Sequence, residues 1–177
     1  MALEFTTSHL KDATELFHYY KKLAERAMAQ VPDEHLTTVL DGESNSIAHI
    51  VKHLAGNMLS RWTDFLTTDG EKPWRERDGE FVDGTQSREA LMELWETGWK
   101  ACFDALAALG EGDLTGTVTI RGEELTVTRA VLRNLTHAGY HVGQILILAR
   151  HFAGDDWEVM TIPRGKSEEY NKQVWKK

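Results

Sequence analysis

The chain has 177 residues and a formal net charge of −8, and its basic residues are scattered among acidic ones. We therefore expect one domain over residues 1–177 and no nucleic-acid surface, which would need clustered Lys and Arg. The single cysteine, Cys102, excludes an intramolecular disulfide and fits a reducing compartment. The N-terminus has no secretory signal pattern, and no apolar run approaches the ~20 residues of a membrane span. These features predict a cytoplasmic protein without membrane or nucleic-acid partners.

Four segments have apolar residues three or four positions apart, which is the periodicity of amphipathic helices. They cover residues 8–30, 44–66, 87–109 and 129–152. Ser8, Ser87 and Thr128 are the expected N-caps of the first, third and fourth helices. Pro32 and Gly154 follow the first and last segments and are typical helix terminators.

The apolar period changes from 3.6 to 2 between the third and fourth segments. Residues 117–120 and 124–127 flank the dipeptide Arg121-Gly122, which predicts a short β-hairpin with a two-residue loop. Such a loop places Val118 opposite Leu125, so that both apolar side chains share one face. Four helices with this insert predict an all-α four-helix bundle, with the hairpin between the third and fourth helices.

Two other segments have weaker signals. Residues 67–86 form a connection of unusual length, and such loops are often functional or mobile. Its Trp74, Arg75 and Arg77 could cover a site and hold a carboxylate, or Trp74 could anchor a surface loop. The tail, residues 166–177, could hold one further short helix ending at Trp175.

Three histidines are the candidate metal ligands. His137 and His141 lie four residues apart, so their side chains stand one above the other on a helix. At ~100° per residue, these two share a flank of the fourth helix, and His53 lies at the border of the second helix's apolar stripe. His49 lies nearly opposite that stripe and is a poorer candidate. Three protein ligands with an open position are typical of catalytic zinc sites, although such spacing also arises by chance.

Other chemistries fit the residues less well. A zinc protease needs Glu after the first histidine, whereas Ala138 follows His137. A ferritin-like di-metal site needs two Glu-x-x-His motifs, and only Glu15 with His18 matches. Cys102 lies in an apolar helical run, which favours a small core residue over a nucleophile.

Four polar or aromatic side chains lie near the candidate ligands in sequence. Gln144 and Asn57 each follow a histidine by about one turn. Each could orient a ligand or hydrogen-bond a histidine, or it could form a helix–helix hydrogen bond. Trp62 and Tyr140 could pack in the core or form a pocket wall. The sequence leaves both choices open.

Three segments of the chain read SNSIAHIVKHLAGNMLSRWTDFL, TTDGEKPWRERDGEF and NLTHAGYHVGQILILARHF. They resemble the DinB/YfiT-like superfamily, and are closest to a subfamily known as a domain of unknown function. The most specific pieces are His53-Leu54 and the block from His137 to Ile145. The resemblance implies a four-helix bundle, commonly a homodimer, with a divalent metal held by His53, His137 and His141. The run Ile-Leu-Ile-Leu at 145–148 is apolar nearly all round, which fits burial on more than one side, as in a dimer.

The resemblance also suggests a class of reaction. Relatives include thiol-dependent S-transferases, an isomerase and proposed metal-dependent hydrolases. A divalent ion, zinc or nickel, held by neutral imidazoles lowers the pKa of a bound water or thiol. We therefore expect an S-transferase or hydrolase acting on a small molecule, with a low-molecular-weight thiol as cofactor in the first case. The alternative is a non-catalytic metal-binding or stress-related bundle protein.

Overall fold

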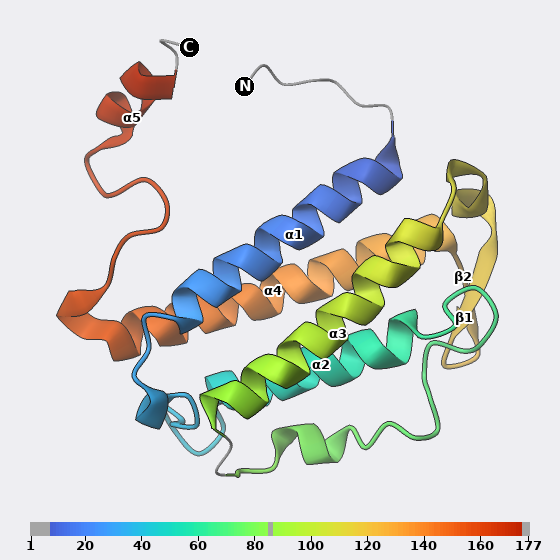
Figure 1. The fold of residues 1–177 in the computed structure, drawn as a ribbon, viewed down its shortest axis with the longest axis horizontal. Coiled ribbons are helices and arrows are strands. Elements are labelled where there is room, and N and C mark those ends of the chain that lie inside the picture. Colours follow the sequence, from blue (N-terminus) through green and yellow to red (C-terminus); the bar gives the residue numbers. More distant parts are fainter. Residues whose placement is uncertain (1–7, 85–86, 175–177) are drawn as a thin grey trace.

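The computed structural model describes residues 8–84 and 87–174, and within them four long helices pack as a bundle (Figure 1). The helices are α1 (His9–Met28), α2 (Ile47–Trp62), α3 (Arg88–Ala108) and α4 (Val127–Ala153), with the short α5 (Ser167–Val174) in the tail. Strands β1 (Thr117–Ile120) and β2 (Glu123–Thr126) lie between α3 and α4. The all-α bundle with one hairpin insert, predicted from the sequence, is confirmed.

The helices pair in an order that their sequence patterns left open. In Figure 1, α1 lies beside α4 and runs in the same direction, and α2 lies beside α3, also in parallel. The two pairs run in opposite directions. Because α2 and α3 are parallel, the chain must return along the whole bundle between them. Residues 63–84, here called the crossover segment, make that return, and the 3₁₀ turn η2 (Asp78–Phe81) lies within it.

Hydroxyl caps set where the helices begin. The side chains of Ser8 and Ser87 accept hydrogen bonds from the backbone of the first turns of α1 and α3, as predicted. The predicted cap Thr128 is wrong, because its hydroxyl donates to the Leu114 carbonyl, 2.9 Å away. Thr126 caps α4 instead and accepts from the Arg129 N–H at 3.1 Å. The helix therefore starts two residues earlier than expected.

Helix α2 is shorter at both ends than the predicted 44–66. Ser46 is its N-cap, and Ser46 and His49 form a reciprocal capping box. At the other end, Thr63 has extended backbone and Asp64 has a left-handed φ of 49°, which stops the helix after Trp62.

The hairpin has the predicted register, with Val118 opposite Leu125 and both side chains buried. Its two loop residues have positive φ, 55° at Arg121 and 76° at Gly122, as a two-residue turn of type I′ requires. Strand β2 ends one residue before the predicted 127, because Val127 opens α4. The Asp69 carboxylate accepts hydrogen bonds from the backbone N–H groups of Arg121 and Gly122, which fixes the turn against the crossover segment.

Helix α2 is the most enclosed element of the bundle, and one prediction about exposure was wrong. His49, expected to face away from the core, is only 6% exposed, because the crossover segment covers it and places Asp83 3.1 Å from its Nε2. In the run 145–148 of α4, Ile145 and Leu148 are buried in the single chain and Ile147 is 69% exposed, so the predicted burial on more than one side stays a prediction. Cys102 is fully buried, as expected of a core residue.

One prediction concerns the C-terminal end of the chain. The predicted tail helix is present as α5, whereas the predicted last residue, Trp175, lies outside the described residues. Among the described helices, none has the length and apolar character needed to cross a membrane.

Candidate metal site

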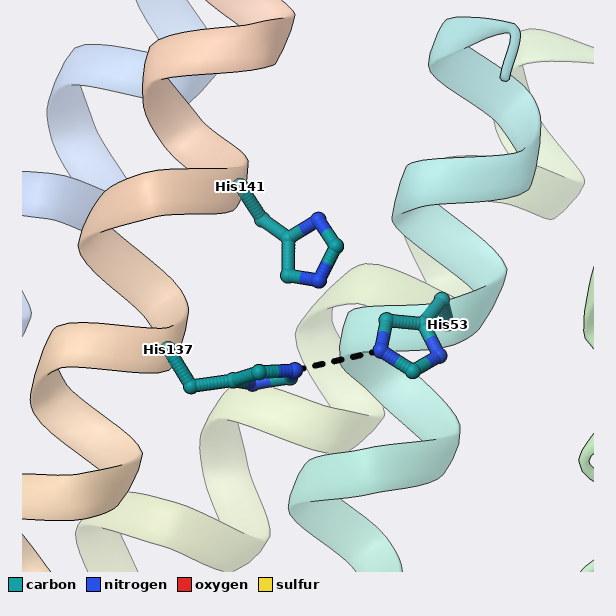
Figure 2. Close-up of side chains that lie close together, drawn as sticks. All are labelled: His53, His137 and His141. Atoms are coloured by element: carbon teal, nitrogen blue, oxygen red, sulfur yellow. Dashed lines mark hydrogen bonds between the residues drawn. The ribbon is translucent and has the colours of Figure 1, made fainter. Parts of the chain in front are cut away.

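The three predicted histidines lie side by side between α2 and α4. His137 and His141 project from successive turns of α4 toward His53 on α2 (Figure 2). The Nε2 atoms of His53 and His137 are 3.2 Å apart, and one nitrogen from each of the three rings lies within 4.8 Å of the others. His53 and His141 are buried, and His137 is half-buried. Residues 84 positions apart in sequence thus form one cluster of nitrogens.

Two of the three imidazoles are oriented by neighbouring side chains. His53 Nδ1 lies 2.8 Å from Glu80 Oε2 and His141 Nδ1 lies 2.9 Å from Gln144 Oε1, so each Nδ1–H donates to an oxygen. This leaves the Nε2 lone pairs of His53 and His141 directed into the cluster. Carboxylate and amide partners of this kind set the tautomer of metal-binding histidines. Of the two roles considered for Gln144, the structure shows the bond to a histidine.

Glu80 was missed by the sequence analysis, which left the role of residues 67–86 open. The crossover segment lays it against α2 at Gly56, where an added Cβ would lie 2.2 Å from Glu80 Oε1. The guanidinium of Arg75 forms two hydrogen bonds with the same carboxylate, at 2.8 and 2.9 Å. Burial raises the pKa of Glu80, but the hydrogen bonds from His53 and Arg75 outweigh it, so the net shift is downward. Glu80 is therefore an ionised hydrogen-bond acceptor. Gly56, which has no side chain to block the Glu80 carboxylate, is the one feature of the local sequence that relates to this contact.

The donor set fits a divalent metal. In the described part of the chain, His141 Nε2 and His137 Nδ1 are buried without a hydrogen-bond partner, which is costly for polar nitrogens. Burial, then the neighbouring His141 and His53, lowers the pKa of His137 to about 3. Burial and His53 lower the pKa of His141 to about 4, although its bond to Gln144 raises it. Both imidazoles are thus neutral near pH 7, the form that binds metals.

The histidine cluster opens onto a cavity of about 260 Å³. His53 and His137 line one part of it, and Ile120 and Arg121 of the hairpin line another. Such a volume suits a small molecule, since pockets for drug-sized ligands are larger, at roughly 300–1,000 Å³. The site therefore combines a cluster of metal-type ligands with space for a substrate beside it.

Comparisons with known proteins agree with this architecture. Residues 4–166 match the family described as "Protein of unknown function (DUF1572)". The chain belongs to the DUF1572 family. Among solved structures, it is similar to YfiT from Bacillus subtilis, described as a probable metal-dependent hydrolase with an unusual four-helix bundle topology. The TM-score is 0.67 at 16% identity, over 89% of this chain and 94% of YfiT. A comparison with curated protein sequences found no match.

The expected resemblance to the DinB/YfiT-like superfamily is thus confirmed, and the DUF1572 chain shares the YfiT fold. At 16% identity the likeness concerns the fold, which by itself does not decide an activity. Metal binding by His53, His137 and His141 stays a prediction, which their placement supports.

Other candidate residues of the DUF1572 site have structural roles. Asn57 accepts a hydrogen bond from Asn134, which in turn accepts one from the indole of Trp62, both at 2.8 Å. This chain links α2 to α4 under the cavity, so Asn57 forms the helix–helix bond and also lines the pocket. Tyr140 lines the cavity as well. Trp74 is 53% exposed, which disfavours its role as an anchor of the loop.

Glu80→Gln should weaken metal binding without unfolding the DUF1572 bundle. The substitution removes the negative charge that accepts from His53 and Arg75, and loss of such a partner typically costs 10–100-fold in metal affinity. Competition of the purified variant with a chromogenic zinc chelator measures the effect.

Asp83→Asn is the matched control, because Asp83 is also a crossover carboxylate beside a histidine of α2, the non-cluster His49. Its affinity for zinc should equal that of the wild type. Equal affinities for the wild type and Glu80→Gln would contradict the role given to Glu80.

Proposed function

We propose that the chain is a metal-dependent enzyme that hydrolyses a small molecule, with one divalent ion, zinc or nickel, held by His53, His137 and His141. The observation that carries the proposal is the convergence of three imidazoles, two of them oriented by Glu80 and Gln144, beside a cavity. The shared fold with YfiT, described as a probable metal-dependent hydrolase, supports the reaction class.

The chemistry follows from the donor set. Three neutral nitrogens leave a bound divalent ion with its full charge, so it would act as a Lewis acid and lower the pKa of a water or thiol in its open position. Glu80 and Gln144 hold the rings in place, so little reorganisation is needed on binding. The Asn57–Asn134 pair and Trp62 link α2 to α4 by hydrogen bonds at the wall of the cavity.

An S-transferase differs from a hydrolase only in the nucleophile, a low-molecular-weight thiol instead of water. A non-catalytic metal-binding protein differs in having no turnover at all. Because the three alternatives use the same histidines, an activity assay can distinguish them but the geometry of the site cannot.

The test begins with the metal content of the full chain, purified without chelators. We expect about one zinc or nickel per chain, and turnover of small esters or amides that is lost on chelation and restored by metal. Turnover only when a thiol and an electrophile are both present would establish the transferase instead. Metal without any turnover would favour the non-catalytic protein, and no metal binding would contradict the proposal in every form.

We also propose that the enzyme is a homodimer with Ile147 of α4 in the interface. Ile147 is 69% exposed beside the buried Ile145 and Leu148, so this large apolar side chain of α4 is in contact with solvent in the single chain. Ile147→Glu should convert the dimer to a monomer in size-exclusion chromatography with light scattering. Val159→Glu, at an apolar residue 51% exposed beyond α4, should leave the dimer intact. A wild-type monomer would contradict this proposal.

A further inference from the structure

The cavity beside the histidines is lined by an unusual number of arginines for a chain of net charge −8. Five of the fourteen described residues that line it are arginine, and none is Asp or Glu. The arginines come from α2, the crossover segment, the hairpin turn and α4: Arg61, Arg75, Arg77, Arg121 and Arg133. A pocket with guanidinium groups on several sides and no carboxylate in its wall attracts anions.

Two of these arginines already form hydrogen bonds with other residues of the protein. Arg75 forms both of its described bonds with Glu80. Arg61 bonds to Glu71 at 3.0 Å and to the Gly70 carbonyl, and is buried. Their charges contribute to the field of the cavity, but their donors already have partners.

The other arginines are held less completely. Arg121 donates a hydrogen bond from Nε to Glu71 at 2.8 Å. Glu71 also accepts a hydrogen bond from Arg61, so two guanidinium groups share one carboxylate. Arg133 lies 3.7 Å from its nearest carboxylate, Glu123, which is beyond hydrogen-bonding distance. Arg77 is 4.0 Å from Asp78. Their side chains are each about half exposed, so they can reach a ligand.

The backbone of the hairpin turn holds Arg121 in place. The Asp69 carboxylate accepts from the N–H groups of Arg121 and Gly122, both at 2.8 Å, and Gly70 N–H donates to the Thr119 carbonyl. Arg121 has a left-handed φ of 55°, a conformation that costs free energy for a residue other than Gly. The turn thus presents a guanidinium to the cavity from a firmly docked position.

Two of the arginines lie on the same helices as the histidines, one or two turns away from them. Arg133 precedes His137 by one turn of α4, and Arg61 follows His53 by two turns on α2. An anion at Arg121 and Arg133 would therefore lie roughly one helical turn, about 5 Å, beyond the histidine cluster. A small molecule could hold its anionic group there while its reacting bond faces the histidines.

We propose that the substrate carries an oxyanion, a carboxylate or a phosphate, bound by Arg121 and Arg133 at the hairpin end of the cavity. The proposal rests on the hydrolase function above, because it names the substrate class of the same site. Guanidinium groups pair with both kinds of oxyanion through two parallel hydrogen bonds, so the two share one recognition chemistry.

The test is calorimetric titration of the full chain, with and without zinc, at constant ionic strength. The probes are inorganic phosphate, succinate and the neutral analogue succinamide. We expect phosphate or succinate to bind also without zinc, and succinamide not to bind. The stronger of the two anions identifies the oxyanion. Arg121→Gln and Arg133→Gln should each weaken binding by about tenfold or more.

Arg129→Gln is the charge-matched control. Arg129 lies one turn before Arg133 and 4.0 Å from the same Glu123, but does not line the cavity, so this variant should bind as the wild type does. Binding that needs zinc and ignores the arginine substitutions would overturn the proposal, as would equal losses in all three variants. Arginine-dependent anion binding in a chain that takes up no metal would contradict the hydrolase function and leave the oxyanion site standing.

Discussion

His141→Ala should abolish tight metal binding. The substitution removes one of three nitrogens that lie within 4.8 Å of each other, and leaves two ligands from different helices. We expect the affinity for zinc to fall by more than about 100-fold. This loss exceeds the roughly 10–100-fold that is typical when a hydrogen-bond partner of a metal ligand is removed. The rise in melting temperature that zinc gives the wild type should disappear, because a ligand stabilises only the state that binds it. Calorimetry with zinc and thermal unfolding measure both effects, and turnover should vanish with them.

His49→Ala is the control for this experiment. His49 is as buried as His53 and lies one turn away on α2, but it bonds to the Ser46 N–H and faces Asp83. Its loss should lower the stability of the metal-free chain by about 1 kcal/mol through the cap and leave zinc affinity unchanged. A His141→Ala chain that retains one tightly bound zinc would contradict the assignment of the ligands.

Gly98→Ala should destabilise the bundle, although alanine is the better helix former. A Cβ at Gly98 would lie 2.6 Å from the Cα of Ala55 and 3.1 Å from its carbonyl oxygen. These are backbone atoms of α2, so relief requires α2 and α3 to separate. Overpacking of this kind typically costs about 1–3 kcal/mol in the free energy of unfolding. Urea denaturation of the metal-free chain measures the change.

Gly143→Ala tests the same substitution where there is space. Gly143 lies within α4, and an added Cβ meets nothing within 4 Å. Helix propensity should then dominate, and the free energy of unfolding should rise by up to about 1 kcal/mol. If Gly98→Ala were also stabilising, the close approach of α2 and α3 would not be a constraint on the fold.

Local patterns were sufficient to predict the elements. Apolar spacing predicted each bundle helix to within a few residues, and Arg121-Gly122 predicted the hairpin register, because caps, periodicity and turn residues act over short distances. The predicted cap Thr128 was wrong, because its hydroxyl donates to the carbonyl of Leu114, a residue distant in sequence, and Thr126 caps α4 instead.

The neighbours of the site depend on contacts that no local pattern encodes. His49 was expected to face away from the core on the basis of helix geometry alone, yet the crossover segment covers it. Glu80 reaches His53 because the same segment passes over Gly56, and nothing in its own sequence distinguishes it from other acidic loop residues.

The amino-acid sequence by itself determined the four helices, the hairpin and the three histidines, since periodicity and i,i+4 spacing are properties of single segments. Only the tertiary structure decided that α2 and α3 run in parallel, which makes the crossover segment necessary. That return path places Glu80 behind His53 and docks the hairpin turn at the cavity, so that Arg121 faces the same space as His137. These contacts join residues 27 and 53 positions apart, and their free energy is gained only when the whole chain has folded.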